Sequence, residues 1–144
     1  MGSSFVGIGE KGFWLRDGFL ELWLRLLALH IKDPSRNDPD AAVIRGIRDQ
    51  WLLASRGFFN GSVPVNLGDA LRTKAGEKAV REAAASLQSA LEAAPDILGK
   101  DAFNLLGFES GWEKDVETRD LIEIGRSFRD VLDGKAPPKT PPKK

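Results

Sequence analysis

Residues 12–31, GFWLRDGFLELWLRLLALHI, form the most apolar stretch of the chain and contain its only histidine, His30. On a helical wheel, Asp17, Glu21 and Arg25 fall in one narrow stripe, and large apolar side chains occupy most of the remaining circumference. A helix that is apolar around most of its surface is usually enclosed by neighbouring elements. The stretch therefore predicts a central helix within a packed core.

The charges in and around this stretch also argue against a membrane segment. A membrane-spanning helix needs about 20 nearly charge-free residues, and a secretory signal has an uncharged apolar run before its cleavage site. Here charged side chains interrupt or directly precede the run at Glu10, Lys11, Arg16, Asp17, Glu21 and Arg25. The sequence thus predicts neither a span nor a signal.

The composition is that of a folded globular domain. The 144 residues are 42% hydrophobic and 29% charged, and a chain of this length can bury one continuous core. There is no cysteine and only one histidine, so a thiolate metal site is excluded and neither a metal nor a cofactor is expected. The absence of cysteine favours a reducing compartment, and we expect a cytoplasmic protein.

The charge is unevenly distributed although the formal net charge is zero. Four lysines lie in residues 135–144, KAPPKTPPKK, which contain no acid, so the preceding 134 residues carry a small acidic excess. A mildly acidic body does not attract phosphate backbones, which argues against nucleic-acid binding and suits a basic protein partner. The Lys/Pro-rich tail cannot bury an apolar face and is expected to be disordered.

Local signals predict four principal helices, joined by short connecting helices, within a single domain of residues 1–134 that begins with a flexible lead-in, residues 1–11. Asp38 and Pro39 start the second helix, which ends near Arg56, and Thr73 caps the third. The principal helices are expected within residues 12–31, 39–56, 74–94 and 115–132. The predicted fold class is therefore all-α, a compact bundle of about four helices.

Residues 7–12, GIGEKG, match the G-x-G-x-x-G pattern of dinucleotide-binding loops. In those folds the pattern follows a β-strand within a βαβ unit, which lets the glycine backbone approach a pyrophosphate. Here only Phe5 and Val6 precede the pattern as apolar residues, and no parallel-sheet pattern follows it. We interpret the glycines as part of the lead-in rather than as a nucleotide site.

His30 is the candidate for a ligand site. It falls near Trp23 on the helical wheel, opposite the charged stripe, so an apolar ligand between helices with His30 at the pocket mouth is an alternative function. The simpler interpretation is a helix-end histidine near the last carbonyls. Because no nucleophile or second ligand lies at helical spacing from His30, catalysis by this residue is not expected.

Paired carboxylates are a second route to chemistry, since two of them can hydrolyse a glycoside. Asp17 with Glu21, and Asp115 with Glu117 or Asp120, have suitable spacing. All of these residues fall on helix exteriors or in first turns, where solvation and capping explain them. A carboxylate-based enzyme is therefore the lowest-ranked of the three functional hypotheses.

Two of the four tryptophans are expected outside the core. Trp14 falls beside Arg25 in the charged stripe, and Trp112 lies in the loop sequence ESGW. Tryptophan and arginine are enriched where proteins recognise partners, although each tryptophan could instead close one end of the core. The predicted recognition surface consists of Trp14, Asp17, Glu21 and Arg25, with a second patch at Glu109, Trp112 and Glu113.

These features predict a small helical protein that acts by binding another protein and is not an enzyme. Bacterial antitoxins, immunity proteins and secretion chaperones are the kinds of accessory protein that work in this way.

Overall fold

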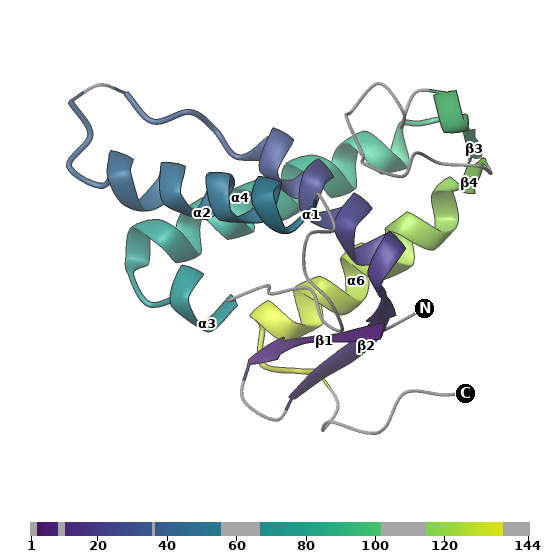
Figure 1. The fold of residues 1–144 in the computed structure, drawn as a ribbon, viewed down its shortest axis with the longest axis horizontal. Helices are drawn as coiled ribbons and strands as arrows, with labels where there is room; N and C mark the ends of the chain where they lie inside the picture. The colour runs from purple at the N-terminus through teal and green to yellow at the C-terminus, as the bar shows by residue number, and fades with distance from the viewer. Residues whose placement is uncertain (1–2, 9–10, 36, 56–66, 102–114, 137–144) are drawn as a thin grey trace.

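The computed structural model describes residues 3–8, 11–35, 37–55, 67–101 and 115–136. Within these residues the chain is mostly helical and contains two small antiparallel strand pairs (Figure 1). The elements are, in chain order, β1 (Ser3–Ile8), β2 (Lys11–Arg16), α1 (Asp17–His30), α2 (Ala41–Ala54), α3 (Leu67–Ala70), α4 (Lys74–Glu92), β3 (Ile97–Leu98), β4 (Val116–Glu117) and α6 (Thr118–Leu132).

The chain begins with a β-hairpin, so the all-α prediction is wrong at this end. Strand β1 pairs with β2 and places Phe5 opposite Trp14 and Val6 opposite Phe13. The predicted flexible lead-in therefore contains a strand, and residues 12–16 of the apolar stretch are extended rather than helical. Glycines disfavour a helix here, whereas aromatic and β-branched side chains suit paired strands.

The rest of the apolar stretch forms α1, and its predicted central position is confirmed. Helix α1 contacts α2, α4 and both strands of the hairpin (Figure 1). Its interior side chains include Trp23, whose ring meets that of Phe128 on α6 edge to face with the centroids 6.0 Å apart. The buried residues of α1 are Leu20, Leu22, Trp23, Leu24, Leu27 and Ala28.

Helix α2 begins at Ala41, two residues later than predicted. The Asp38 carboxylate accepts a 2.8 Å hydrogen bond from the Asp40 amide, and the Asp38 carbonyl accepts one of 3.1 Å from the Ala41 amide. These bonds form a turn that includes Pro39, so Asp40 takes the N-cap position. The predicted end at Arg56 lies outside the described residues.

Helices α4 and α6 follow the prediction closely. Thr73 caps α4, because its hydroxyl oxygen accepts a 3.0 Å hydrogen bond from the Gly76 amide. Helix α6 begins at Thr118 rather than at residue 115, since Val116–Glu117 pairs with Ile97–Leu98. The stripe predicted for α6 is buried throughout and consists of Leu121, Ile124, Phe128, Val131 and Leu132.

A left-handed glycine ends α6. Gly134 has a φ of 73°, and the next amide, that of Lys135, donates a 2.8 Å hydrogen bond back to the Asp130 carbonyl. Most of the tail that is predicted to be disordered, residues 137–144, lies outside the described part of the chain. Of the helices that the structure describes, none combines the length and the apolar character that a transmembrane span requires.

Candidate functional site

Trp14 lies on the outer face of the hairpin, and the pairing register explains why. Successive side chains of a strand point to opposite faces, so Val6 and Phe13 share one face while Phe5 and Trp14 share the other. Val6 is fully buried in the core, whereas the half-buried Trp14 meets Phe5 edge to face with ring centroids 5.5 Å apart. Trp14 therefore belongs to the hairpin surface and not to the stripe of α1.

The glycines of the G-x-G-x-x-G pattern give Phe5 the space for this arrangement. Gly7 and Gly12 are directly opposite each other in the hairpin. A Cβ at Gly7 would lie 2.6 Å from the ring of Phe5, and one at Gly12 would lie 2.8 Å from it. The aromatic ring thus covers the two glycines, an arrangement that compensates for the weak strand propensity of glycine. These two glycines have a structural explanation that does not involve a phosphate.

A shallow groove separates the start of the apolar stretch from α6, and we call it the aromatic–acidic groove. It encloses about 320 Å³. One wall comes from β2 and α1 and the other from α6. Among the described residues its lining consists of Phe13, Trp14, Leu15, Phe19, Asp120, Glu123, Ile124 and Ser127. Both carboxylates of this lining are exposed, so the groove combines an aromatic surface with an acidic rim.

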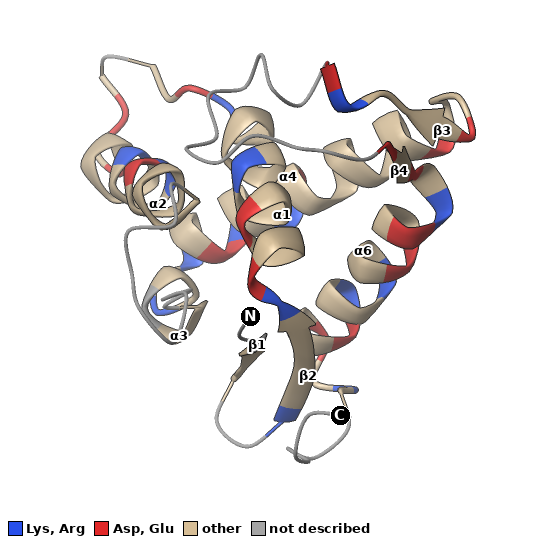
Figure 2. Cartoon of the chain, turned by 45° about the vertical axis from the view of Figure 1, so that its right-hand side comes forward, with Lys and Arg blue, Asp and Glu red and all other residues tan. Residues whose placement is uncertain are grey.

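The fold holds the aromatic wall in place from behind. Phe13, Leu15 and Phe19 are partly buried and pack against the core cluster, and Ile124 of the opposite wall belongs to that cluster. Helix α6 carries both acidic and basic positions along its length (Figure 2), and the charged residues of α6 that line this groove are Asp120 and Glu123. Because both walls rest on packed core residues, the groove is a preformed feature of the fold rather than a loose surface.

The residues predicted to form a surface with Trp14 come from α1. Asp17, Glu21 and Arg25 are half-buried on α1, and none of the three lines the aromatic–acidic groove. The Ser4 hydroxyl donates a 2.6 Å hydrogen bond to Asp17, which joins the hairpin to the first turn of α1. Burial, and secondarily the charge of Asp17, raises the pKa of Glu21. The groove that Trp14 lines therefore takes its acids from α6 rather than from α1.

The second predicted patch, which consists of Glu109, Trp112 and Glu113, lies outside the described residues. Asp120 and Glu123, which were not predicted to belong to a recognition surface, are the acids that line the same groove as Trp14. Their α6 positions are visible in the sequence, but nothing in the sequence indicates that this face of α6 meets the hairpin.

His30 and Trp23, the residues of the predicted ligand site, each contact another helix. His30 Nδ1 lies 2.8 Å from the Ser86 hydroxyl oxygen on α4, and burial lowers the pKa of the imidazole. Trp23 is fully buried against Phe128. Neither residue lines the groove beside α6, the one between α4 and α6, or the one between α2 and α4. The contact of His30 is therefore a link between α1 and α4.

The chemistry available in the described part is limited. Within it, no three histidine or carboxylate side chains come close enough together to hold a metal ion. No protein-family model matches the sequence, no curated protein matches it, and no solved structure matches the fold. The site itself is therefore the basis for a functional proposal.

Proposed function

We propose that this chain is a small, non-enzymatic protein-binding module that recognises a basic segment of another protein through the aromatic–acidic groove. The observation that supports the proposal is that Trp14 and Phe19 line the same groove as Asp120 and Glu123. Aromatic side chains are enriched at the centres of protein interfaces, where they supply apolar contact area at a low entropic cost. An acidic rim favours a partner segment that carries lysine or arginine.

The complementary partner is an apolar or aromatic side chain flanked by basic residues. The apolar anchor would cover Trp14, and the flanking cations would face Asp120 and Glu123. The acidic excess of residues 1–134 would also speed the approach of such a segment at low salt. This role suits a cytoplasmic accessory protein of the antitoxin, immunity-protein or secretion-chaperone kind, and the absence of cysteine supports the choice of compartment.

Selection from an unbiased peptide library tests the proposal. Phage-displayed random peptides are selected on the purified full-length chain, and the winning peptides are synthesised and measured by isothermal titration calorimetry. We expect the winners to combine an aromatic or aliphatic residue with lysine or arginine. Trp14→Ala should weaken their binding at least about tenfold, as expected for a central interface tryptophan.

Charge reversal provides a variant that leaves the core intact. Asp120→Lys together with Glu123→Lys changes two exposed residues and should abolish binding of the selected basic peptides, while Asp49→Lys, an exposed residue on α2, should leave it unchanged. Selection of acidic peptides, or equal binding to the parent and the double variant, would reject the proposed groove.

A further inference from the structure

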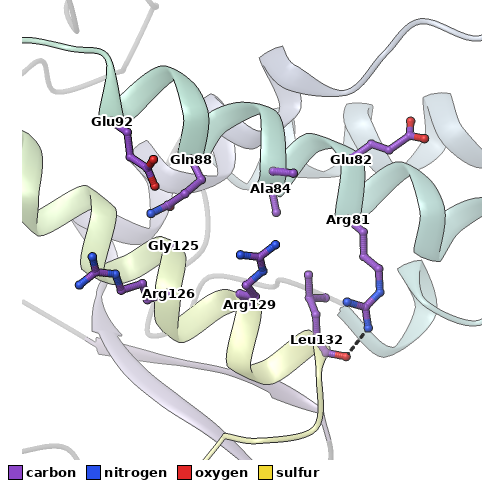
Figure 3. A pocket seen from close by; sticks show the side chains of 10 residues that line it. Arg81, Glu82, Ala84, Gln88, Glu92, Gly125, Arg126, Arg129 and Leu132 are labelled. Carbon is purple, nitrogen blue, oxygen red and sulfur yellow. Dashed lines mark hydrogen bonds between the residues drawn. The ribbon is translucent and has the colours of Figure 1, made fainter.

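A second groove lies between α4 and α6, on residues that the aromatic–acidic groove does not use. It encloses about 400 Å³, and we call it the α4–α6 groove (Figure 3). This volume is within the range of small-molecule sites. Ala84 is among its lining residues, and its small side chain leaves space between the helices, whereas the space at Gly125 is filled by the Gln88 side chain. The groove can therefore admit a compact ligand without displacing a large side chain.

Arg81 closes one end of this groove and is held in a fixed position. Its Nη2 donates a 2.7 Å hydrogen bond to the Leu132 carbonyl at the end of α6, which Figure 3 shows as a dashed line. Its Nη1 and Nε donate to Asp133 and Glu77, at 2.8 and 3.2 Å. Because two carboxylates already balance its charge, Arg81 is a boundary of the groove and not its principal charged contact.

Two opposite charges face the interior of the groove without forming a pair. In Figure 3, Arg129 extends from α6 toward α4, and Glu92 extends from α4 toward α6, with Gln88 between them. Neither the Arg129 nor the Glu92 side chain forms a hydrogen bond or ion pair with another described side chain, although the charge of Arg129 contributes to the lowered pKa of Asp133. The side-chain oxygen of Gln88 is buried and has no hydrogen-bond partner in the described part. The groove thus offers one cation and one anion, next to a buried amide oxygen that lies against Gly125.

Two further charged side chains in the lining are directed away from this centre. Glu82 points outward in Figure 3 and lies 3.9 Å from the Lys78 ammonium, and Arg126 points along α6 away from Gln88. The charges that remain at the centre are those of Arg129 and Glu92, which sum to zero. A purely anionic ligand would be repelled by Glu92, and a purely cationic one by Arg129.

We propose that the α4–α6 groove binds a small zwitterion that carries both an ammonium and a carboxylate group. The carboxylate would accept hydrogen bonds from Arg129, the ammonium would donate to Glu92, and the apolar body would lie over Ala84. Such a ligand bridges two charges that do not reach each other, and it leaves neither of them unpaired. This site goes beyond the proposed protein-binding function and shares no residue with the aromatic–acidic groove.

Titration with three isosteric probes tests the assignment. 6-Aminohexanoate carries both charges, hexanoate lacks the ammonium, and hexylamine lacks the carboxylate. Leucine tests a zwitterion with a shorter separation of charge. Each probe is added to the full-length protein while backbone amide NMR signals of Gly125 and Ala84 are followed. We expect saturable shifts with at least one zwitterion at millimolar concentration, and at least fivefold weaker binding of both singly charged probes.

Matched variants separate the two inward-pointing side chains from their outward-pointing neighbours. Arg129→Gln and Glu92→Gln should each weaken binding of the zwitterion at least fivefold, while Arg126→Gln and Glu82→Gln should leave it unchanged. All four positions are exposed, so the variants should keep the parent fold. Equal binding of hexanoate or hexylamine, or no saturable shift with either zwitterion up to about 20 mM, would overturn the proposal.

Discussion

Arg81 on α4 donates a 2.8 Å hydrogen bond to Asp133, the residue that directly follows α6. The same guanidinium binds Glu77 on its own helix and the Leu132 carbonyl, which α6 leaves unpaired at its end. One side chain therefore caps a helix that lies some fifty residues further along the chain and ties the two helices together.

Removal of this guanidinium should weaken the fold moderately. Arg81→Gln loses three hydrogen bonds from a side chain that is 40% exposed, and solvent already screens part of their contribution. We expect the free energy of unfolding, measured in urea, to fall by about 1 kcal/mol. Arg119→Gln, at an exposed position on α6, should change it little. Equal losses of stability from the two substitutions would contradict the conclusion that Arg81 ties α4 to α6.

The hydrogen bond to Asp133 should also make the stability depend on acid. The bond from Arg81 lowers the pKa of Asp133 below its ordinary value of 3.8. The folded state therefore binds this proton less readily than the unfolded chain does. The resulting stability is present above the ordinary pKa and is lost as the pH falls toward the folded pKa. The Tm advantage of the parent over Asp133→Asn should be constant near neutral pH and shrink below about pH 4. An advantage that is unchanged by acid would contradict this linkage.

A glycine-to-alanine pair tests the close approach of α4 and α6. A Cβ at Gly125 would overlap the side-chain oxygen of Gln88 and lie 3.2 Å from the Trp23 ring, whereas one at Gly46 on α2 would meet no described atom within 4 Å. We expect Gly125→Ala to lower the free energy of unfolding by about 1–3 kcal/mol. Gly46→Ala should raise it by about 0.5–1 kcal/mol through helix propensity. Thermal unfolding of both variants measures the difference, and a stabilised Gly125→Ala would contradict the packing.

Two leucines of α1 distinguish its buried side from its exposed side. Leu27 is fully buried, while Leu29 is 58% exposed. Leu27→Ala should reduce the free energy of unfolding by about 2–5 kcal/mol, because it removes core contacts and leaves a cavity. Leu29→Ala should change it by about 0.5 kcal/mol or less. Chemical denaturation of the two variants provides the comparison, and similar losses would show that α1 is not oriented as described.

His30 should contribute a second pH dependence, near neutrality. Burial lowers the pKa of its imidazole from the ordinary value of 6.5, so the unfolded chain binds this proton more readily than the folded protein. Stability should consequently decrease as the pH falls through 6.5 toward the folded pKa. The Tm of the parent should drop relative to that of His30→Gln between about pH 7 and pH 5, and the two should run parallel above that window. Parallel curves at all pH values would contradict the burial effect.

Much of the helical framework could be predicted because it depends on neighbours in the sequence. The apolar positions of α6 recur at helical spacing, and all five residues assigned to its inner stripe are buried. Thr73 precedes α4 and caps it as its side-chain chemistry indicates. These features follow from the period of the helix and from capping, neither of which requires a distant contact.

The hairpin was missed because a helical wheel assumes one backbone conformation over the whole stretch. Trp14 and Arg25 lie close together on the wheel, but residues 11–16 pair with residues 3–8 and turn Trp14 toward Phe5 instead. The glycines that resembled a phosphate loop were the signal for this pairing. They allow Phe5 to lie across both strands, which no analysis of helical spacing detects.

The sequence by itself determined that α1 is the interior helix, that Thr73 caps α4 and which face of α6 is buried. These features depend on periodicity and local hydrogen bonding, which operate over a few residues. Only the tertiary structure decided that Trp14 shares a groove with Asp120 and Glu123, and that Arg129 and Glu92 share another. Those neighbours come from segments far apart in the chain. Their proximity follows from how the hairpin and the two helices pack. Packing depends on how the surfaces of whole elements fit together, which local sequence patterns do not encode.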